Sequence, residues 1–188
     1  MNEKSKNLKD WNKFLDSDGV KRSIVKSAFY LLSYEMLKNS VVDKIKDFYI
    51  VGFENQEFIY SDEYNNKVAS RKIEGKQNVF LSSLYWLEEN GAITKDDISE
   101  IKDIRDFRNT VAHEIDKILV DSDYSIDEKK EIRIFELIKQ IEVWWIKEVE
   151  IPTNPDFDGQ EINGEEILSG KEIFYSYIKN ITEELLKK

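Results

Sequence analysis

Apolar residues recur every three or four positions along most of this chain, which is the spacing of helices that bury one face. The longest such pattern starts at about Val20 and reaches Phe48. Its apolar residues fall into two stripes, Ile24, Ala28 and Leu31 on one and Val25, Phe29, Leu32 and Met36 on the other. Two stripes on one helix predict that it packs against two neighbours.

The same spacing predicts four further helices. One runs from Gln77 to Asn90 and stops at Gly91, and the next runs from about Lys95 to Ile118 behind a capping box at Thr94 and Asp97. A second capping box, Ser125 with Glu128, predicts a helix that continues to about Val149. The last predicted helix carries the apolar stripe Phe174, Tyr177, Ile178, Ile181 and Leu185.

Three stretches lack this period. Residues 1–19 form a polar arm with Trp11, Phe14 and Leu15 as docking anchors, ending in a turn at residues 16–19. Residues 49–76 are strand-like at 58–60 and predict a loop or short hairpin inserted between helices. Residues 151–164 predict a loop, so that 151–188 is a loop plus a C-terminal helix. The sequence therefore predicts one all-α domain over 1–188, an up-and-down bundle of about five helices.

Composition narrows the function classes. The chain is 40% hydrophobic and 12% aromatic, enough for a packed core, and its net charge is −10. This charge argues against a broad basic surface for nucleic acid, so any positive charge that handles phosphate must be local. The chain has no cysteine, no signal-like N-terminus and no apolar run of membrane-spanning length. We expect a cytoplasmic protein without a membrane segment and without a cofactor.

A local basic cluster closes the 49–76 insertion. It consists of Lys67, Arg71, Lys72 and Lys76. Charged clusters are usually solvated surface, and that is the first interpretation. The alternative is a patch that steers phosphate toward a site nearby.

The densest polar chemistry lies between Arg105 and Glu114, which includes His113, the only histidine of the chain. On a helix, Arg105, Asn109 and His113 share one polar stripe, because each step of four residues turns only slightly past a full turn. Arg108 lies about 140° from His113 and borders the apolar side. A guanidinium there needs a carboxylate, a phosphate or a second subunit beside it, because an unpaired buried charge is costly.

Arg108-Asn109-x-x-x-His113 resembles the signature of the HEPN superfamily, an Arg followed after four to six residues by a His, often with a polar residue directly after the Arg. The motif covers six residues, and the helical layout extends the resemblance loosely over residues 20–150. The resemblance implies an endoribonuclease, of the kind found as toxins or in antiviral defence, sometimes paired with an antitoxin protein. In some such toxins the antitoxin modifies a Tyr two residues after the His, where this chain has Ile115.

The implied chemistry is RNA cleavage without a metal. The RNA 2′-hydroxyl attacks the adjacent phosphate, His113 transfers a proton, Arg108 stabilises the extra charge, and Asn109 orients the imidazole or binds a phosphate oxygen. Arg105 is a weaker phosphate-binding candidate. Such cleavage benefits from both a base and an acid, whereas one chain has one histidine, so a homodimer that brings two motif helices together would supply both.

Two alternatives remain open. The first is a non-catalytic helical binding or dimerisation module, in which Arg108 and His113 stabilise an interface or hold a nucleotide phosphate. The second is calcium binding, because Asn154-x-Asp156-x-Asp158-Gly159 followed by Glu165 has the spacing of an EF-hand loop. Pro155 and Glu161 depart from that pattern and no second loop pairs with it, so an acidic turn is the preferred interpretation.

Overall fold

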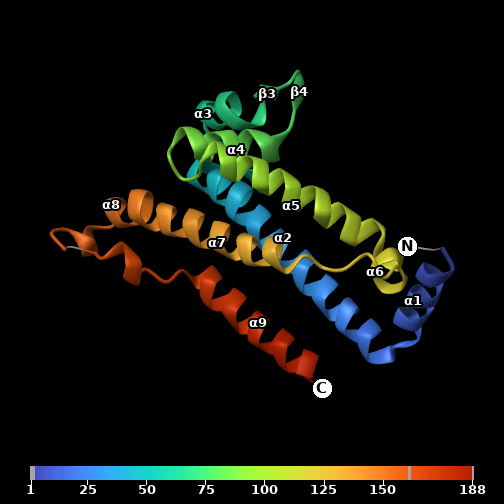
Figure 1. Ribbon diagram of the computed structural model, residues 1–188. Helices are drawn as coiled ribbons and strands as arrows, with labels where there is room; N and C mark the ends of the chain where they lie inside the picture. The colour runs from blue at the N-terminus through green and yellow to red at the C-terminus, as the bar shows by residue number, and fades with distance from the viewer. Residues whose placement is uncertain (1–2, 161, 188) are drawn as a thin grey trace.

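Helices make up most of the described residues, 3–160 and 162–187, in the computed structural model (Figure 1). The predicted mostly helical class is confirmed. The longer helices are α1 (Glu3–Leu15), α2 (Ser17–Phe48), α4 (Val79–Glu89), α5 (Lys95–His113), α6 (Ile115–Val120), α7 (Glu128–Trp145) and α9 (Gly170–Lys187). None of the described helices is at once long enough and apolar enough to span a lipid bilayer.

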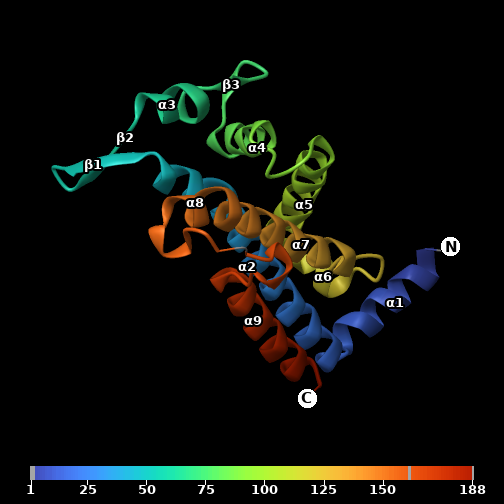
Figure 2. The same cartoon turned by 90° about the vertical axis from the view of Figure 1, so that its left-hand side faces the viewer.

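The central element is α2, which packs against α4, α5, α7 and α9 (Figures 1 and 2). Tyr30, Leu37 and Ile45 on α2 are fully buried. The two predicted stripes are only partly correct, since Phe29 and Met36 are buried whereas Ile24, Ala28 and Leu32 are exposed. The buried face instead includes Ser27, Ser33 and Ser40, small side chains that let neighbouring helices approach α2 closely.

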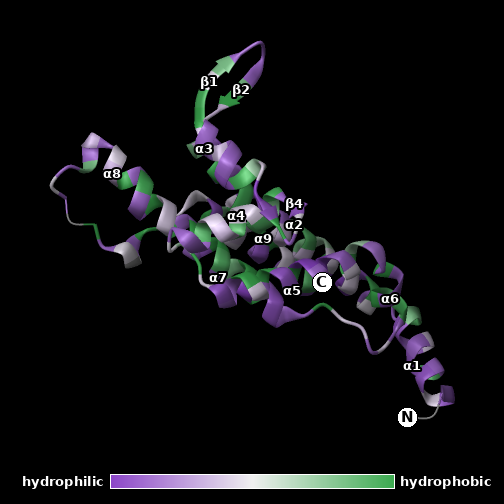
Figure 3. Cartoon of the chain, turned by 90° about the horizontal axis from the view of Figure 1, so that it is seen from above, coloured by the Kyte–Doolittle hydropathy of each residue, from purple (hydrophilic) through white to green (hydrophobic). Residues whose placement is uncertain are grey.

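The insertion between α2 and α4 contains the expected hairpin. Strands β1 (Ile50–Glu54) and β2 (Glu57–Tyr60) pair antiparallel, and Asn55 and Gln56 turn the chain with φ of 53° and 69°. The hairpin projects from the bundle, and Figure 3 shows apolar residues along it. A short helix α3 (Asp62–Tyr64), a one-turn π-helix η1 (Asn65–Ala69) and a second hairpin, β3 (Lys72–Ile73) with β4 (Lys76–Gln77), lead into α4.

The N-terminal segment is a helix rather than a polar arm. No residue of α1 is buried, and the predicted anchors Trp11, Phe14 and Leu15 are exposed. Polar contacts attach α1 to the end of α6, where the Lys13 ammonium donates to the carbonyl of Asp121 at 2.7 Å. The expected turn at 16–19 is reduced to Asp16, because α2 already starts at Ser17.

Capping decides where the two helices of the middle region start. The capping box of Thr94 and Asp97 is confirmed at the start of α5. The box expected at Ser125 is wrong, because α7 starts at Glu128 and the Asp127 side chain accepts the backbone N–H groups of Lys129 and Lys130. Asp127 is the N-cap because it lies directly before the first turn of α7, where its carboxylate reaches those two N–H groups.

The motif helix ends earlier than predicted. Helix α5 stops at His113, and α6 starts anew at Ile115 after Glu114 leaves the helical conformation with φ −128° and ψ 36°. The apolar pattern runs on through this break, so periodicity alone did not reveal it. His113 consequently lies at a helix end instead of in mid-helix.

The C-terminal third contains more turns than the predicted loop. Helix α7 continues through a one-turn π-helix η2 (Ile146–Glu150) into α8 (Ile151–Thr153), and two short 3-10 turns, η3 (Pro155–Phe157) and η4 (Gly164–Glu166), precede α9. Figure 1 shows this segment turning back so that α9 lies along the bundle. The predicted C-terminal helix is confirmed.

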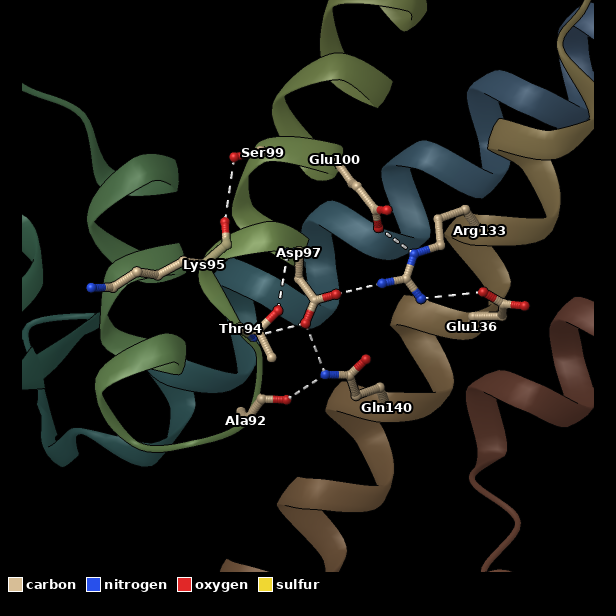
Figure 4. A network of polar contacts seen from close by, with 9 residues as sticks. All are labelled: Ala92, Thr94, Lys95, Asp97, Ser99, Glu100, Arg133, Glu136 and Gln140. Carbon is tan, nitrogen blue, oxygen red and sulfur yellow. Dashed lines mark hydrogen bonds and ion pairs between the residues drawn. The ribbon is translucent and has the colours of Figure 1, made fainter.

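A polar network joins the start of α5 to α7 (Figure 4). The buried Asp97 carboxylate accepts the Thr94 backbone N–H at 2.7 Å and the Gln140 amide at 3.1 Å, and it pairs with Arg133. Burial alone would raise the pKa of Asp97, but these hydrogen bonds and the Arg133 charge outweigh it and hold the pKa below its usual range. The network holds the N-terminal turn of α5 against α7.

A second buried carboxylate joins α2, α7 and α9. Glu142 is 3% exposed, accepts the Ser40 hydroxyl at 2.8 Å, and pairs with Lys171 at 3.0 Å and Lys44 at 3.2 Å. Burial acts to raise the pKa of Glu142, yet the Ser40 hydrogen bond and the two ammonium groups lower it below its usual value.

This lowered pKa makes stability depend on pH. Because the unfolded state binds a proton at higher pH than the folded state, the contribution of Glu142 is complete above the unfolded pKa of 4.5 and is lost as pH falls through the folded pKa. We expect the free energy of unfolding, measured by urea titration from pH 6 down to about 3, to fall less steeply in Glu142→Gln than in wild type. Exposed Glu148→Gln is the control, and equal slopes for the two variants would contradict the assignment.

Candidate functional site

His113 is open to solvent at the C-terminal end of α5. Its side chain is exposed, and within the described parts of the chain it takes part in no hydrogen bond or ion pair. The break at Glu114 keeps the next turn of helix from continuing past it. An imidazole placed in this way is accessible to a molecule that binds at this end of α5.

Arg108 is held against α2. One guanidinium nitrogen, Nη2, donates to the Glu35 carboxylate at 2.7 Å, and the guanidinium carbon lies 5.4 Å from the centre of the Tyr34 ring. The other terminal nitrogen, Nη1, lies 3.4 Å from the Asn109 side-chain oxygen. Of the three partners that the sequence left open for Arg108, a carboxylate, a phosphate or a second subunit, the structure provides the Glu35 carboxylate, and the Arg108 side chain remains 29% exposed.

One donor of Arg108 stays unused. The Nε atom is buried and has no hydrogen-bond partner among the described residues. Burial raises the pKa of the neighbouring Tyr34 phenol, although the charges of Arg105 and Arg108 offset part of that effect. The phenol is therefore protonated at neutral pH and lies beside the guanidinium as a neutral ring.

The predicted polar stripe is present on α5. Asn109 and His113 are exposed one turn apart, and Arg105 is half-buried and pairs with its neighbour Asp106 at 3.2 Å. Arg108 and His113 point in different directions, since five residues separate them by about 140° around the helix and about 7.5 Å along it. Arg108 and His113 of one chain therefore cannot both bind the same phosphate unless another part of the active site, such as a second subunit, brings the phosphate between them.

Sequence reasoning missed Tyr34 and Glu35. The sequence required a carboxylate, a phosphate or a second subunit beside Arg108, and only the packing of α2 on α5 shows that the partner is an acid of α2. Several carboxylates along α2 were equal candidates before that packing was known.

The basic cluster lies away from His113. Arg71 pairs with Glu89 at 2.7 Å and 3.0 Å, Lys67 pairs with Glu63, and the exposed Lys72 and Lys76 lie on β3 and β4. These elements flank α4 and the start of α5, whereas His113 ends α5 (Figure 1). A 19-residue helix is about 28 Å long, so the cluster and the histidine occupy opposite ends of the bundle.

Asn154, the first residue of the EF-hand-like loop, acts as a helix cap in the structure. The Asn154 side chain accepts the Asp156 backbone N–H at 3.0 Å and caps the 3-10 turn that follows. The described residues contain no group of three acidic or histidine side chains placed to hold a metal ion. Glu161 and the side chain of Glu165 lie outside the described part of the chain.

The chain matches no protein-family model, no curated protein and no solved structure. The side chains around Arg108 and His113 are therefore the basis for assigning a function.

Proposed function

We propose that this protein is a metal-independent endoribonuclease of the HEPN type whose active site forms across a homodimer. The observation that carries the proposal is His113, a solvent-exposed imidazole with no hydrogen-bond or ion-pair partner among the described residues, five residues from an arginine whose guanidinium is already oriented. The six-residue motif supports the same proposal. In this role the protein acts in the cytoplasm as a toxin or antiviral defence effector, and an antitoxin or another defence protein is its expected partner.

The reaction requires no group beyond side chains and substrate. The RNA 2′-oxygen forms a bond to phosphorus and gives its proton to one His113 imidazole. The bond from phosphorus to the 5′-oxygen breaks, and the leaving oxygen takes a proton from the His113 of the second copy. The products are a 2′,3′-cyclic phosphate and a 5′-hydroxyl.

Arg108 stabilises the charge that develops on the phosphate oxygens. Its donors act in the transition state, where the phosphorus carries an additional oxygen. The bond to Glu35 fixes the plane of the guanidinium, which lowers the entropy cost of binding phosphate but also neutralises part of its charge. Asn109, next to Arg108 and one turn before His113, is placed to bond a phosphate oxygen or the imidazole.

The test is the chemistry of the RNA ends. We expect the purified protein to cleave RNA in excess EDTA and to leave 2′,3′-cyclic phosphate and 5′-hydroxyl ends. Bacterial cells that express the wild-type chain should stop growing, whereas cells that express His113→Ala should grow. Equal growth with intact RNA in both cases, or cleavage that EDTA abolishes, contradicts the proposal.

One observation favours a second candidate, a non-catalytic binding module. Arg108 already has a carboxylate partner within its own chain, as a purely structural arginine would. In such a protein His113→Ala would leave the biological effect intact, and disrupting dimerisation would remove it.

A further inference from the structure

A cavity of about 790 Å³ lies at the end of the bundle where α1 and α6 meet the first turns of α2 (Figure 1). The loop between α6 and α7 forms its other wall. The most buried side chains that line it are Phe107 of α5, Ile118 of α6 and Ile126, so its floor is apolar. Its volume is within the range of about 300–1,000 Å³ that is typical of small-molecule sites.

Arg22 lines this cavity and has the weakest ion pair of any arginine in the chain. The four other arginines each have a carboxylate oxygen at 3.2 Å or closer, and they are Arg71, Arg105, Arg108 and Arg133. For Arg22 the closest carboxylate oxygen among the described residues is 3.9 Å away, on Asp16, which is beyond hydrogen-bond distance. The N–H donors of this guanidinium are therefore available to an anion in the cavity.

The other charged groups of the cavity leave a second cation unpaired. The ammonium of Lys129 takes part in no hydrogen bond or ion pair among the described residues. Three carboxylates also line the cavity, but each has a partner: Glu128 and Asp123 form ion pairs with lysines at 2.6 Å and 3.0 Å, and Asp127 caps α7. In a chain of net charge −10, the charged groups that remain unpaired at this cavity are cations, which suits an anionic ligand.

Tyr124 adds an aromatic ring to the wall of the cavity. The residue is 39% exposed, and the Lys117 ammonium lies 5.9 Å from the centre of its ring. Aromatic rings among cations are the surfaces on which proteins stack nucleobases. The hydroxyl groups of Ser23 and Ser125 also line the cavity and make no hydrogen bond within the described parts of the chain. One cavity thus offers a ring for a base, cations for a phosphate and hydroxyls for a sugar.

We propose that this cavity binds a nucleoside phosphate, with the phosphate held by Arg22 and Lys129 and the base against Tyr124 and the apolar floor. An inorganic phosphate would leave the aromatic and apolar surfaces uncovered, and a purely apolar ligand would leave the two cations without an anion. A free nucleotide and one nucleotide of an RNA strand present the same groups, so the chemistry of the site is the same for both sources.

The cavity lies on another side of α5 than His113. Phe107 and His113 are about 120° apart around the helix and about 9 Å apart along it. Phe107 lines the cavity before the break at Glu114, and Ile118 lines it after the break. The inference therefore goes beyond the proposed function, because it adds a binding site next to the candidate active site and needs no catalysis.

The experiment measures the binding of adenosine monophosphate to the purified full chain by isothermal titration calorimetry. We expect binding whose Kd rises about tenfold in Arg22→Gln, in Lys129→Gln and in Tyr124→Leu, the usual cost of losing one charged hydrogen bond or one stacked base. Lys21→Gln is the control, because it removes the same charge from the adjacent exposed position of α2, outside the cavity, and should leave the Kd unchanged. Circular dichroism verifies that each variant is folded.

A second probe, a short RNA whose 2′-hydroxyls are methylated so that it cannot be cleaved, separates the two sources. Tighter binding of this RNA than of adenosine monophosphate, with the same dependence on Arg22 and Tyr124, assigns the cavity to an RNA strand, and the reverse order assigns it to a free nucleotide. No binding of either probe at millimolar concentration, an equal loss in Lys21→Gln, or inorganic phosphate that binds as tightly as adenosine monophosphate overturns the inference. A chain that binds as expected yet leaves RNA intact upholds the inference and refutes the proposed nuclease activity.

Discussion

His113→Ala is expected to lower the rate of RNA cleavage by about 10²–10⁴-fold, the usual contribution of a general acid or base. The loss should occur without a change in the thermal midpoint, because the imidazole is exposed and contributes no hydrogen bond or ion pair to the described fold. Initial rates on a short fluorescent RNA, with melting curves on the same samples, provide the measurement.

Lys95→Ala is the matched control. Lys95 is exposed on the same helix, at the end remote from His113, and its loss removes a positive charge that could attract RNA non-specifically. A comparable fall in rate for both variants would mean that general electrostatics, rather than proton transfer at His113, accounts for the activity.

Mixing subunits tests whether both histidines act on one phosphate. When wild-type and His113→Ala chains are unfolded together and refolded in equal amounts, about a quarter of the dimers carry two imidazoles. We expect the activity to fall to about that fraction. An activity proportional to the amount of wild-type chain would show that each subunit works alone.

The largest effect on stability is expected at Asp97. Asp97→Ala removes the N-cap partner of Thr94, the acceptor of Gln140 and the carboxylate that Arg133 faces, while Asp97 itself is only 6% exposed (Figure 4). Losing one partner of a buried, hydrogen-bonded charge pair typically costs 3–5 kcal/mol, and Arg133 keeps Glu100 and Glu136, so about 3 kcal/mol is expected here.

Thermal and urea unfolding measure this loss, which corresponds to a midpoint lowered by about 6–12 °C for a chain of this size. Asp96→Ala is the control, because Asp96 is an exposed acid in the same first turn of α5, worth less than about 1 kcal/mol. Equal losses for the two variants would show that the buried network does not hold α5 onto α7.

Local sequence patterns predicted most of the helices and the part of the candidate site that lies on the exposed side of α5. The three-to-four-residue spacing located the helices of the bundle, and Thr94 with Asp97 marked the start of the motif helix, because a capping box involves only neighbours in sequence. The exposed stripe with Asn109 and His113 also follows from helical geometry alone. Where two local signals competed, as at Ser125 and Asp127, the distance to the first-turn N–H groups decided between them.

The sequence by itself determined a helical chain with one exposed imidazole, one arginine in need of a partner for its charge, and no broad basic surface, because each of these depends on residue type and on nearby positions. Only the tertiary structure decided that Glu35 pairs with Arg108, that α5 ends at His113, that the basic cluster lies at the other end of the bundle, and that Ile24 and Leu32 face outward. Those four features depend on how helices far apart in sequence lie against one another, and that arrangement is fixed by the packing of the whole core.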